Sequence, residues 1–227
     1  MASIKVTKIA MTSAKLAAMK QAHRNWLFFL GHVSNELMML NKWVLWSDPH
    51  LPVDDVRQKA SAAQVGFLLR LLLGKQLEAG DVLMKSYFGN PIRTEIDARM
   101  EAGAIEAERR LEDYFERRKD TIHYWVRNNF SFHYSIKDIG SMIAPTKKAE
   151  EMAAYMGEQS GNVLYEMSEA VVNRAMLKGI DTDTRRAIEL AVGTAVEVNG
   201  WLFAFIDGFA LAVLGRPFKD FDLEKHS

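Results

Sequence analysis

Apolar residues recur at helical spacing along most of the chain, and this pattern predicts a series of long α-helices. Ser13 is a suitable N-cap for the first helix, which we expect to run to about Ser47. Its second half, Trp26–Trp46, is apolar almost all round, as is typical of a helix that contacts neighbours on several sides. Among the polar exceptions, His32 and Glu36 share a face at i,i+4 spacing.

A second long helix is expected to begin at Asp54 or Asp55 and to reach about Phe88, where Gly89–Pro91 ends it. The segment Arg93–Lys119 is rich in Glu and Arg and has few large apolar residues, so we expect a solvated helix. The predicted core face of the second helix consists of Val65, Leu68, Leu69, Leu72 and Leu73.

The second half of the chain continues in the same pattern. Thr121–Asn129 is predicted to continue or restart the helix, and Ser135 to cap a short helix through Ile143. A long helix follows over Lys147–Lys178, and a last one begins at Thr182 or Asp183 and ends at Leu214. The buried positions predicted for the helix over Lys147–Lys178 are Met152, Tyr155, Met156, Leu164, Met167 and Val171.

These elements predict an all-α fold, a single helical bundle of about five to seven helices. Strand alternation, internal repeats and low-complexity linkers are not evident in the sequence. A length of 227 residues with 48% hydrophobic residues is ample for one large core. We therefore expect one domain over residues 1–227, with frayed ends at 1–11 and 218–227.

Composition and charge narrow the class of protein. There are no cysteines, which excludes disulfides, cysteine nucleophiles and thiolate metal sites. The 29 basic and 29 acidic residues balance, which argues against a large non-specific nucleic-acid surface but not against a small local site. The first residues lack the apolar core of a signal peptide. The apolar run Gly200–Leu214, interrupted by Asp207, falls short of a membrane span. We expect a cytoplasmic protein that does not bind membranes.

Metal and cofactor patterns are weak. No Gly-rich phosphate loop, Ser nucleophile elbow or nucleotide-binding fingerprint is found in the sequence. Di-iron bundles carry two Glu-x-x-His repeats, whereas this chain offers the His32/Glu36 pair and an Asp120-x-x-His123 pair. We expect His32 and Glu36 to satisfy each other inside the core. No metal site and no cofactor are predicted, because Met and Trp at helical spacing usually fill a core.

The stretch 121–135 is the strongest candidate for chemistry because it mixes polar and aromatic residues. Buried polar groups against so much aromatic surface need partners, so the stretch is either a structural hydrogen-bond network or a functional site. The polar residues are Arg127, Asn128, Asn129, Ser131 and His133, set among Tyr124, Trp125, Phe130, Phe132 and Tyr134.

An arginine, a polar residue and then a histidine, as in Arg127, Asn128 and His133, resemble the motif of the HEPN superfamily (higher eukaryotes and prokaryotes nucleotide-binding domains). The resemblance implies an all-α bundle and a metal-independent endoribonuclease, or an RNA- or nucleotide-binding relative, of a prokaryotic toxin–antitoxin or phage-defence system. It also implies a homodimer with a composite active site and an antitoxin or other protein partner. Glu36 is a loose match to the acidic residue that faces the motif in related domains.

The residue types suit this chemistry. Histidine titrates near neutrality and suits proton transfer during attack of a ribose 2′-hydroxyl, which assigns His133 as general acid/base. The arginine fork suits the phosphoryl oxygens, which assigns Arg127 to charge stabilisation and Asn128 to positioning. Aromatic residues such as Trp125 and Tyr134 are expected to stack an unpaired base. Asn129, Ser131 and Glu36 complete the predicted site as supporting residues.

One geometric condition applies to this prediction. Six steps of about 100° place Arg127 and His133 some 120° apart on a continuous α-helix. They converge only if the helix ends or bends between them, or if a second subunit supplies one of the groups. The alternative is a non-catalytic protein-interaction or dimerisation module, in which Arg127, Asn128 and His133 tie helix ends together and Glu36 is the counter-ion of Arg127.

Overall fold

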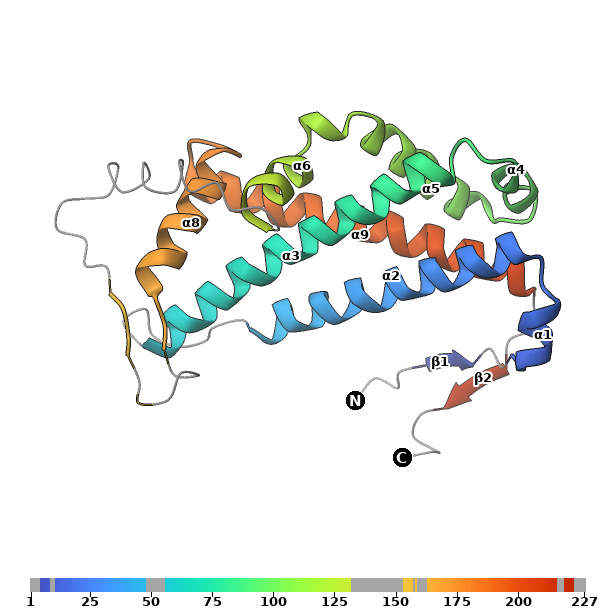
Figure 1. The fold of residues 1–227 in the computed structure, drawn as a ribbon, viewed down its shortest axis with the longest axis horizontal. Coiled ribbons are helices and arrows are strands. Elements are labelled where there is room, and N and C mark those ends of the chain that lie inside the picture. Colours follow the sequence, from blue (N-terminus) through green and yellow to red (C-terminus); the bar gives the residue numbers. More distant parts are fainter. Residues whose placement is uncertain are drawn as a thin grey trace.

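The computed structural model describes residues 5–8, 11–47, 56–131, 153–156, 158, 163–215 and 219–222, and it confirms the all-α bundle (Figure 1). The described residues form eight α-helices, five of which have 13 residues or more. The elements in chain order are β1 (Lys5–Lys8), α1 (Ser13–Ala18), α2 (Gln21–Trp46), α3 (Val56–Ser86), α4 (Pro91–Asp97), α5 (Ala102–Glu116), the 3-10 turn η1 (Arg118–Asp120), α6 (Ile122–Val126), the π-helical turn η2 (Arg127–Ser131), α8 (Glu166–Lys178), α9 (Thr184–Leu214) and β2 (Lys219–Asp222).

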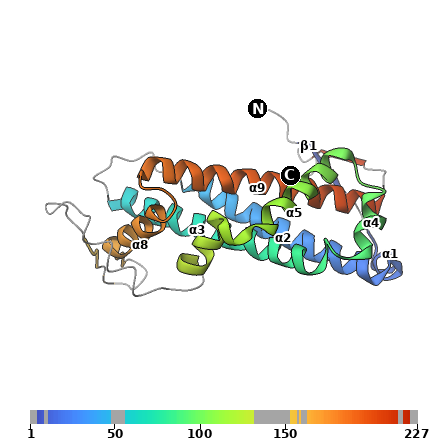
Figure 2. The ribbon, with the colours of Figure 1, turned by 90° about the horizontal axis from the view of Figure 1, so that it is seen from above.

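Three long helices, α2, α3 and α9, run side by side along the long axis of the molecule, and α5 and α6 lie against them (Figures 1 and 2). The predicted core leucines of α3, from Leu68 to Leu73, are buried at the centre of this layer. One connected apolar cluster joins residues from α2, α3, α4, α5, α6, α8 and α9. The bundle therefore has a single core along its length.

Helix α9 is the central apolar helix. Asp183 caps it as predicted, by accepting a hydrogen bond from the backbone N–H of Arg186 at 2.9 Å. Small residues let α5 approach closely, since a Cβ added at Gly208 would lie 2.2 Å from the Cβ of Ala104. In the described part of the chain, α9 is the one helix long and apolar enough to cross a bilayer. Its buried face is nevertheless packed against the other long helices.

A chain of hydrogen bonds crosses the core and joins five helices. His123 of α6 is fully buried, and its Nε2 lies 2.7 Å from Gln76 Oε1 of α3, while its Nδ1 lies 2.8 Å from the Tyr114 hydroxyl of α5. Gln76 Nε2 donates to Asn199 Oδ1 of α9 at 2.7 Å and to the carbonyl of Ala195 at 2.8 Å. Asn199 Nδ2 in turn donates to Asn41 Oδ1 of α2 at 2.8 Å.

The donor and acceptor pattern of this network fixes the state of the histidine. Gln76 Oε1 can only accept, so His123 carries its proton on Nε2 and accepts the Tyr114 hydroxyl on Nδ1. Burial lowers the pKa of His123 to about 3, so the ring is neutral at physiological pH. A neutral, doubly bonded histidine satisfies its own polar atoms without a buried charge.

Three sequence predictions need correction at the N-terminal and central helices. The first predicted helix is two helices, since α1 ends at Ala18 and α2 begins at Gln21. Arg24 of α2 donates hydrogen bonds to the carbonyls of Leu16 and Ala17, which belong to the last turn of α1 and have no partner within that helix. The segment Arg93–Lys119 is also two helices, α4 and α5. Helix α6 ends at Val126 and gives way to the π-helical turn rather than continuing to Asn129 as an α-helix.

The predicted helix over Lys147–Lys178 is wrong for its described first half. Tyr155 and Leu164 form an antiparallel bridge with backbone hydrogen bonds of 2.7 and 2.8 Å, and the helix begins only at Glu166. Met156 and Met167, predicted to be buried, are exposed, whereas Val171 is buried. The sequence has two glycines between the bridged residues, and each disfavours helix by about 1 kcal/mol relative to alanine. The predicted helix over 135–143 and residue Met152 lie outside the described residues.

The two ends of the chain, which we expected to fray, contribute the two strands. Lys5–Lys8 pairs antiparallel with Lys219–Asp222, with Lys5 opposite Asp222 and Lys8 opposite Lys219. Both strands are four residues long. The all-α classification is unaffected by this short ribbon.

The buried network makes a testable prediction about stability. Gln76→Leu leaves His123 Nε2, the Ala195 carbonyl and Asn199 Oδ1 without their partner, and each unsatisfied buried group costs about 1–3 kcal/mol. We expect the free energy of unfolding, measured by urea titration, to fall by at least about 2 kcal/mol. The control, Gln21→Leu at an exposed position of α2, should leave it nearly unchanged. Equal effects of the two substitutions would contradict the role of the network.

Candidate functional site

A groove between α2 and α3 is the place where the predicted site residues Arg127 and Glu36 come together. Its volume is about 390 Å³, and both apolar and charged side chains line it. The apolar lining is Phe29, Val33, Leu37, Ala79 and Val82, and the polar lining is His32, Glu36, Lys75, Glu78, Asp81, Lys85 and Arg127.

Lys75 is the central charge of the groove. Its ammonium lies 3.2 Å from Glu36 Oε1 and 3.7 Å from Glu78 Oε2, and so links α2 to its own helix. His32 Nε2 lies 3.7 Å from the same oxygen of Glu36. The predicted His32/Glu36 pair is therefore present, but its expected position inside the core is wrong, because the His32 side chain is 70% exposed.

Arg127 enters the groove from the π-helical turn and is held there by its neighbour. Its Nη1 donates to Asn128 Oδ1 at 3.0 Å, and its side chain is 29% exposed. Among the described residues, the carboxylate nearest to it is that of Glu78, at 4.0 Å, while Glu36 pairs with Lys75 instead. The buried Nε of Arg127 has no hydrogen-bond partner among the described residues. Within the described part of the chain, the guanidinium is thus positioned by one hydrogen bond and only weakly neutralised.

The π-helical turn bears on the geometric condition for the motif. The chain changes from α-helix to π-helix at Arg127, so a continuous α-helix does not extend through Ser131. π-Helical turns are rare in proteins as a whole, but the single turns that do occur are often found at functional sites. The wider turn reorients the side chains that it carries. His133 and Tyr134 lie outside the described residues, so the convergence of His133 with Arg127 stays a prediction.

The other predicted site residues anchor the turn. Asn129 Nδ2 donates to the carbonyl of Trp125 at 2.8 Å, and the Ser131 hydroxyl donates to the carbonyl of Arg70 at 2.6 Å. The Trp125 indole N–H donates to the carbonyl of Met176 at 3.1 Å. One face of this indole is covered, since a Cβ at Gly179 would lie 2.1 Å from the ring. These contacts use the polar groups of the three residues to hold backbone rather than to face the groove.

Arg70 is a buried charge behind this turn that the sequence interpretation did not single out. Its Nη2 pairs with Glu169 Oε2 of α8 at 2.9 Å, and its Nη1 donates to Asn173 Oδ1 of the same helix. Since Ser131 binds the backbone of Arg70, α8 and the π-helical turn are both fixed to the same turn of α3. The signal available in the sequence was an arginine within the leucine run of the second helix.

Metal ligation finds no support in the described residues, where no three His, Cys, Asp or Glu side chains gather. The Asp120-x-x-His123 pair is not a ligand pair either, because both ring nitrogens of His123 are occupied by Tyr114 and Gln76.

Lys75 and Glu78 are groove residues that the sequence interpretation missed. Their charges stand out from the leucines around them, but the pairing of Lys75 with Glu36 depends on the register of α3 against α2.

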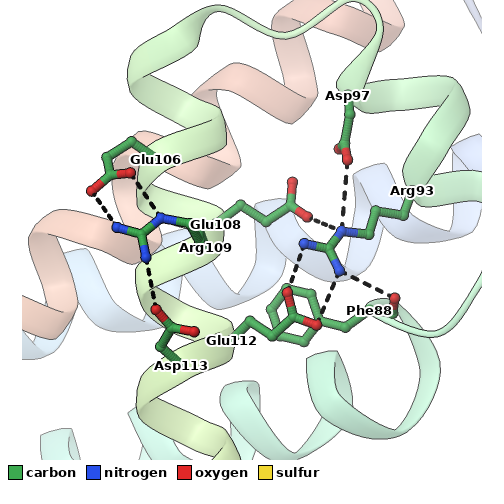
Figure 3. Close-up of polar contacts among 8 residues, drawn as sticks. All are labelled: Phe88, Arg93, Asp97, Glu106, Glu108, Arg109, Glu112 and Asp113. Carbon is green, nitrogen blue, oxygen red and sulfur yellow. Dashed lines mark hydrogen bonds and ion pairs between the residues drawn. The ribbon is translucent and has the colours of Figure 1, made fainter.

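A second charged cluster surrounds Arg93 of α4 (Figure 3), and it shares no residue with the lining of the groove. Its guanidinium binds both oxygens of Glu112 at 3.0 and 2.7 Å, contacts Glu108, and lies 3.6 Å from Asp97. The Glu108 side chain is only 1% exposed. Burial and the neighbouring Asp97 carboxyl raise the pKa of Glu108 to about 8, although Arg93 opposes this shift. The cluster therefore holds three carboxyl groups against one cation.

Comparisons with known proteins give no match to a family model, a curated protein or a solved structure.

The Arg93 cluster predicts an unusual pH dependence of stability. An acid whose pKa is raised in the folded state binds its proton more tightly there, so its contribution is complete below the unfolded value of 4.5 and is lost as pH rises towards 8. Glu108→Gln, which cannot ionise, should reduce the fall in unfolding free energy between pH 5 and pH 8. Urea titrations across this range would measure the slope.

The control for this prediction is Glu106→Gln on the same helix (Figure 3). Arg109 and Arg110 bind Glu106 and lower its pKa to about 2, so its contribution is lost only as pH falls from 4.5 towards 2. This substitution should leave the slope between pH 5 and pH 8 unchanged. A slope that Glu108→Gln does not alter would contradict the raised pKa.

Proposed function

We propose that this chain is a HEPN-like RNA- or nucleotide-binding protein, and in its most specific form a metal-independent endoribonuclease, with the α2–α3 groove as its binding site. One observation carries the proposal. Arg127 is fixed in the groove by Asn128 while its Nε has no partner among the described residues and its ion pair with Glu78 spans 4.0 Å. Because this Nε is buried, the accessible part of the partly exposed guanidinium consists of its Nη groups, and a positioned Nη pair is suited to a phosphate.

The composition of the groove favours a short ligand over a long duplex. Lys75, Lys85 and Arg127 provide positive charge, but Glu36, Glu78 and Asp81 line the same groove. A continuous phosphate track would meet all of these carboxylates, whereas a single phosphate at Arg127 would lie near Glu78 alone, which is 4.0 Å from the guanidinium. The balanced net charge of the whole chain agrees with a local contact of this kind.

The chemistry follows from the roles that the motif assigns. A base removes the proton from a ribose 2′-hydroxyl, the 2′-oxygen attacks the adjacent phosphorus, and the bond to the 5′-oxygen breaks as an acid protonates it. Arg127 stabilises the charge on the phosphoryl oxygens, with Asn128 holding its guanidinium. His133, which the HEPN resemblance assigns as acid/base, supplies the proton transfers. A toxin or phage-defence setting with an antitoxin partner in the cytoplasm rests on the same resemblance.

The alternative function, a protein-interaction module with a structural Arg-Asn-His network, has its own supporting observation. Trp125, Asn129 and Ser131 all direct their polar groups to backbone carbonyls. The alternative requires Arg127 to be structural as well. A partly exposed arginine 4.0 Å from one carboxylate contributes only about 0–1 kcal/mol to stability, which favours the binding function for this residue.

The first test measures binding of a short single-stranded RNA by fluorescence anisotropy in the presence of chelator. Arg127→Ala should weaken binding by at least about tenfold, because loss of a charge-assisted hydrogen-bonding group costs about 1.5–3 kcal/mol. The matched control is Arg185→Ala, which removes an arginine from the exposed start of α9 and should bind as the wild type does. Wild-type protein that binds no RNA, or equal losses in both variants, would contradict the proposal.

The second test separates binding from cleavage. His133→Ala should retain RNA binding and lose cleavage of cellular RNA in chelator, while its melting curve stays that of the wild type. The structural alternative predicts instead that Arg127→Ala lowers the melting temperature markedly, and that neither the wild type nor the variants cut RNA. Cleavage that survives His133→Ala would remove the endoribonuclease part of the proposal and leave the binding part standing.

A further inference from the structure

Helix α4 depends on its neighbours for its position, because an isolated helix of seven residues is not stable in water. It buries two side chains, Ile92 and Ile96. Long polar side chains tie it to the rest of the bundle. Glu95 binds Lys20 at the start of α2, and the cluster around Arg93 joins α4 to α5 (Figure 3). With little apolar surface of its own, α4 relies on these charged contacts to stay in place.

Two carboxyl groups of the cluster, those of Glu108 on α5 and Asp97 at the end of α4, need a proton between them. Both oxygens of the fully buried Glu108 side chain, and Oδ1 of Asp97, find no hydrogen-bond donor among the described residues. The two groups are nevertheless within hydrogen-bonding distance of each other. Two carboxylates can only accept and they repel each other, so such a contact is stable when one member carries a proton. We name Glu108 and Asp97 the carboxyl pair.

Arg93 does not remove the need for this proton. Its guanidinium contacts both members of the carboxyl pair, but it also binds both oxygens of Glu112 and the carbonyl of Phe88. One cation therefore serves three carboxyl groups, and loss of the proton leaves the carboxyl pair with two negative charges instead of one. Burial and then the Asp97 carboxylate raise the pKa of Glu108 to about 8, so the second charge appears just above neutral pH.

Within the described part of the chain, the other ionisable groups beside α4 do not supply a positive charge to replace the proton. The Tyr87 hydroxyl, next to the end of α3, is fully buried, and burial together with the charges of the carboxyl pair raises its pKa, so it stays a neutral phenol. The nearby basic side chains are paired with Glu95, whose pKa is lowered mainly by its hydrogen bond from Lys20. These basic side chains are Lys20, His23 and Arg99.

The end of α4 also leads into one wall of a cavity. Arg99, two residues after Asp97, and Glu101 line this cavity of about 620 Å³ from the connection between α4 and α5. Helix α9 contributes Leu211 and Asp207, an exposed residue and the last ionisable one of that helix. A shift of Asp97 therefore changes the cavity wall.

We propose that the proton of the carboxyl pair holds the C-terminal end of α4 on α5, and that loss of this proton releases the end of α4 and opens the cavity wall. Asp97 is the member that moves, because its side chain is 30% exposed at a helix end. Glu108 is buried in the middle of α5, which packs closely along α9. The start of α4 stays in place through the bonds between Arg93 and Glu112. The release is independent of the proposed function, because the carboxyl pair does not line the groove.

The first experiment locates the proton by a carboxyl-carbon NMR titration of glutamate-labelled protein. The Glu108 signal should titrate with a midpoint of about 8. Asp97→Asn should lower this midpoint by about one pH unit or more, because an amide has no charge to repel Glu108 and can donate to its carboxylate. The matched control, Asp113→Asn, changes an exposed aspartate of α5 that binds Arg109 and should leave the midpoint unchanged. A midpoint near the ordinary value of 4.5, or one that Asp97→Asn does not lower, overturns the proposal.

The second experiment measures the release by hydrogen exchange with mass spectrometry at pH 6 and pH 9, corrected for the intrinsic exchange rate. The amides of Ala98 and Met100 hydrogen-bond to carbonyls of the last turn of α4, so a peptide over residues 94–101 reports on this end. Its protection should fall at least about tenfold between the two pH values, because an acid one unit above its pKa is about ten parts ionised to one part protonated. A peptide over residues 68–77, in the buried part of α3, should keep its protection.

Variants separate the proton from other effects of pH. Glu108→Gln has no charge to gain and should keep the protection of residues 94–101 at pH 9. Asp97→Asn, at a partly exposed position, should do the same, and it decides the question if Glu108→Gln does not fold. The control Glu106→Gln, whose carboxyl is already ionised throughout this range, should lose protection as the wild type does. Wild-type protection that does not change with pH, an equal loss in Asp97→Asn, or a parallel loss in α3 overturns the proposal.

Discussion

The hydrogen bonds of buried His123 are the constraint on which this bundle depends. The ring has no access to water, so both nitrogens must be satisfied inside the core, and Gln76 and Tyr114 do so from two other helices. Gln76 then requires its own acceptors on α9, and these extend the chain of bonds to α2. His123 lies four residues before Arg127, so the same bonds anchor the short helix α6 that leads directly into the π-helical turn.

The described residues of the stretch 121–135 fall into two groups, one that holds backbone in place and one that lies at the groove. Trp125, Asn129 and Ser131 donate to backbone carbonyls on α8, α6 and α3 respectively, and these bonds hold a rare type of turn in place. Arg127 donates to Asn128 and lines a groove whose other charged residues belong to α2 and α3. Within one turn, some residues form a hydrogen-bond network while Arg127 lines the groove that we propose as the binding site, and this division explains why the sequence supports two interpretations.

Much of the fold could be predicted from the sequence because its signals are local. The last helix begins where Asp183 caps it, and the leucines of α3 are buried as their spacing indicates. The Tyr155–Leu164 bridge was missed because its apolar residues keep helical spacing across two glycines. The exposure of His32 and Trp46 was missed because α2 is apolar all round, and such a helix does not reveal which faces its neighbours cover. The groove could not be predicted, because its lining depends on the register between α2 and α3, and the sequence pattern of one helix does not determine that register.

The central claim is that Arg127 is a free phosphate-binding group rather than a structural one. Its Nε–H is buried and has no partner among the described residues, so its NMR signal is a direct reporter of ligand at the groove. Adding a short single-stranded RNA to the labelled protein should shift the Nε–H resonance of Arg127 while leaving that of Arg185, at the far exposed start of α9, unchanged. An Arg127 resonance that does not move at saturating RNA would contradict the account.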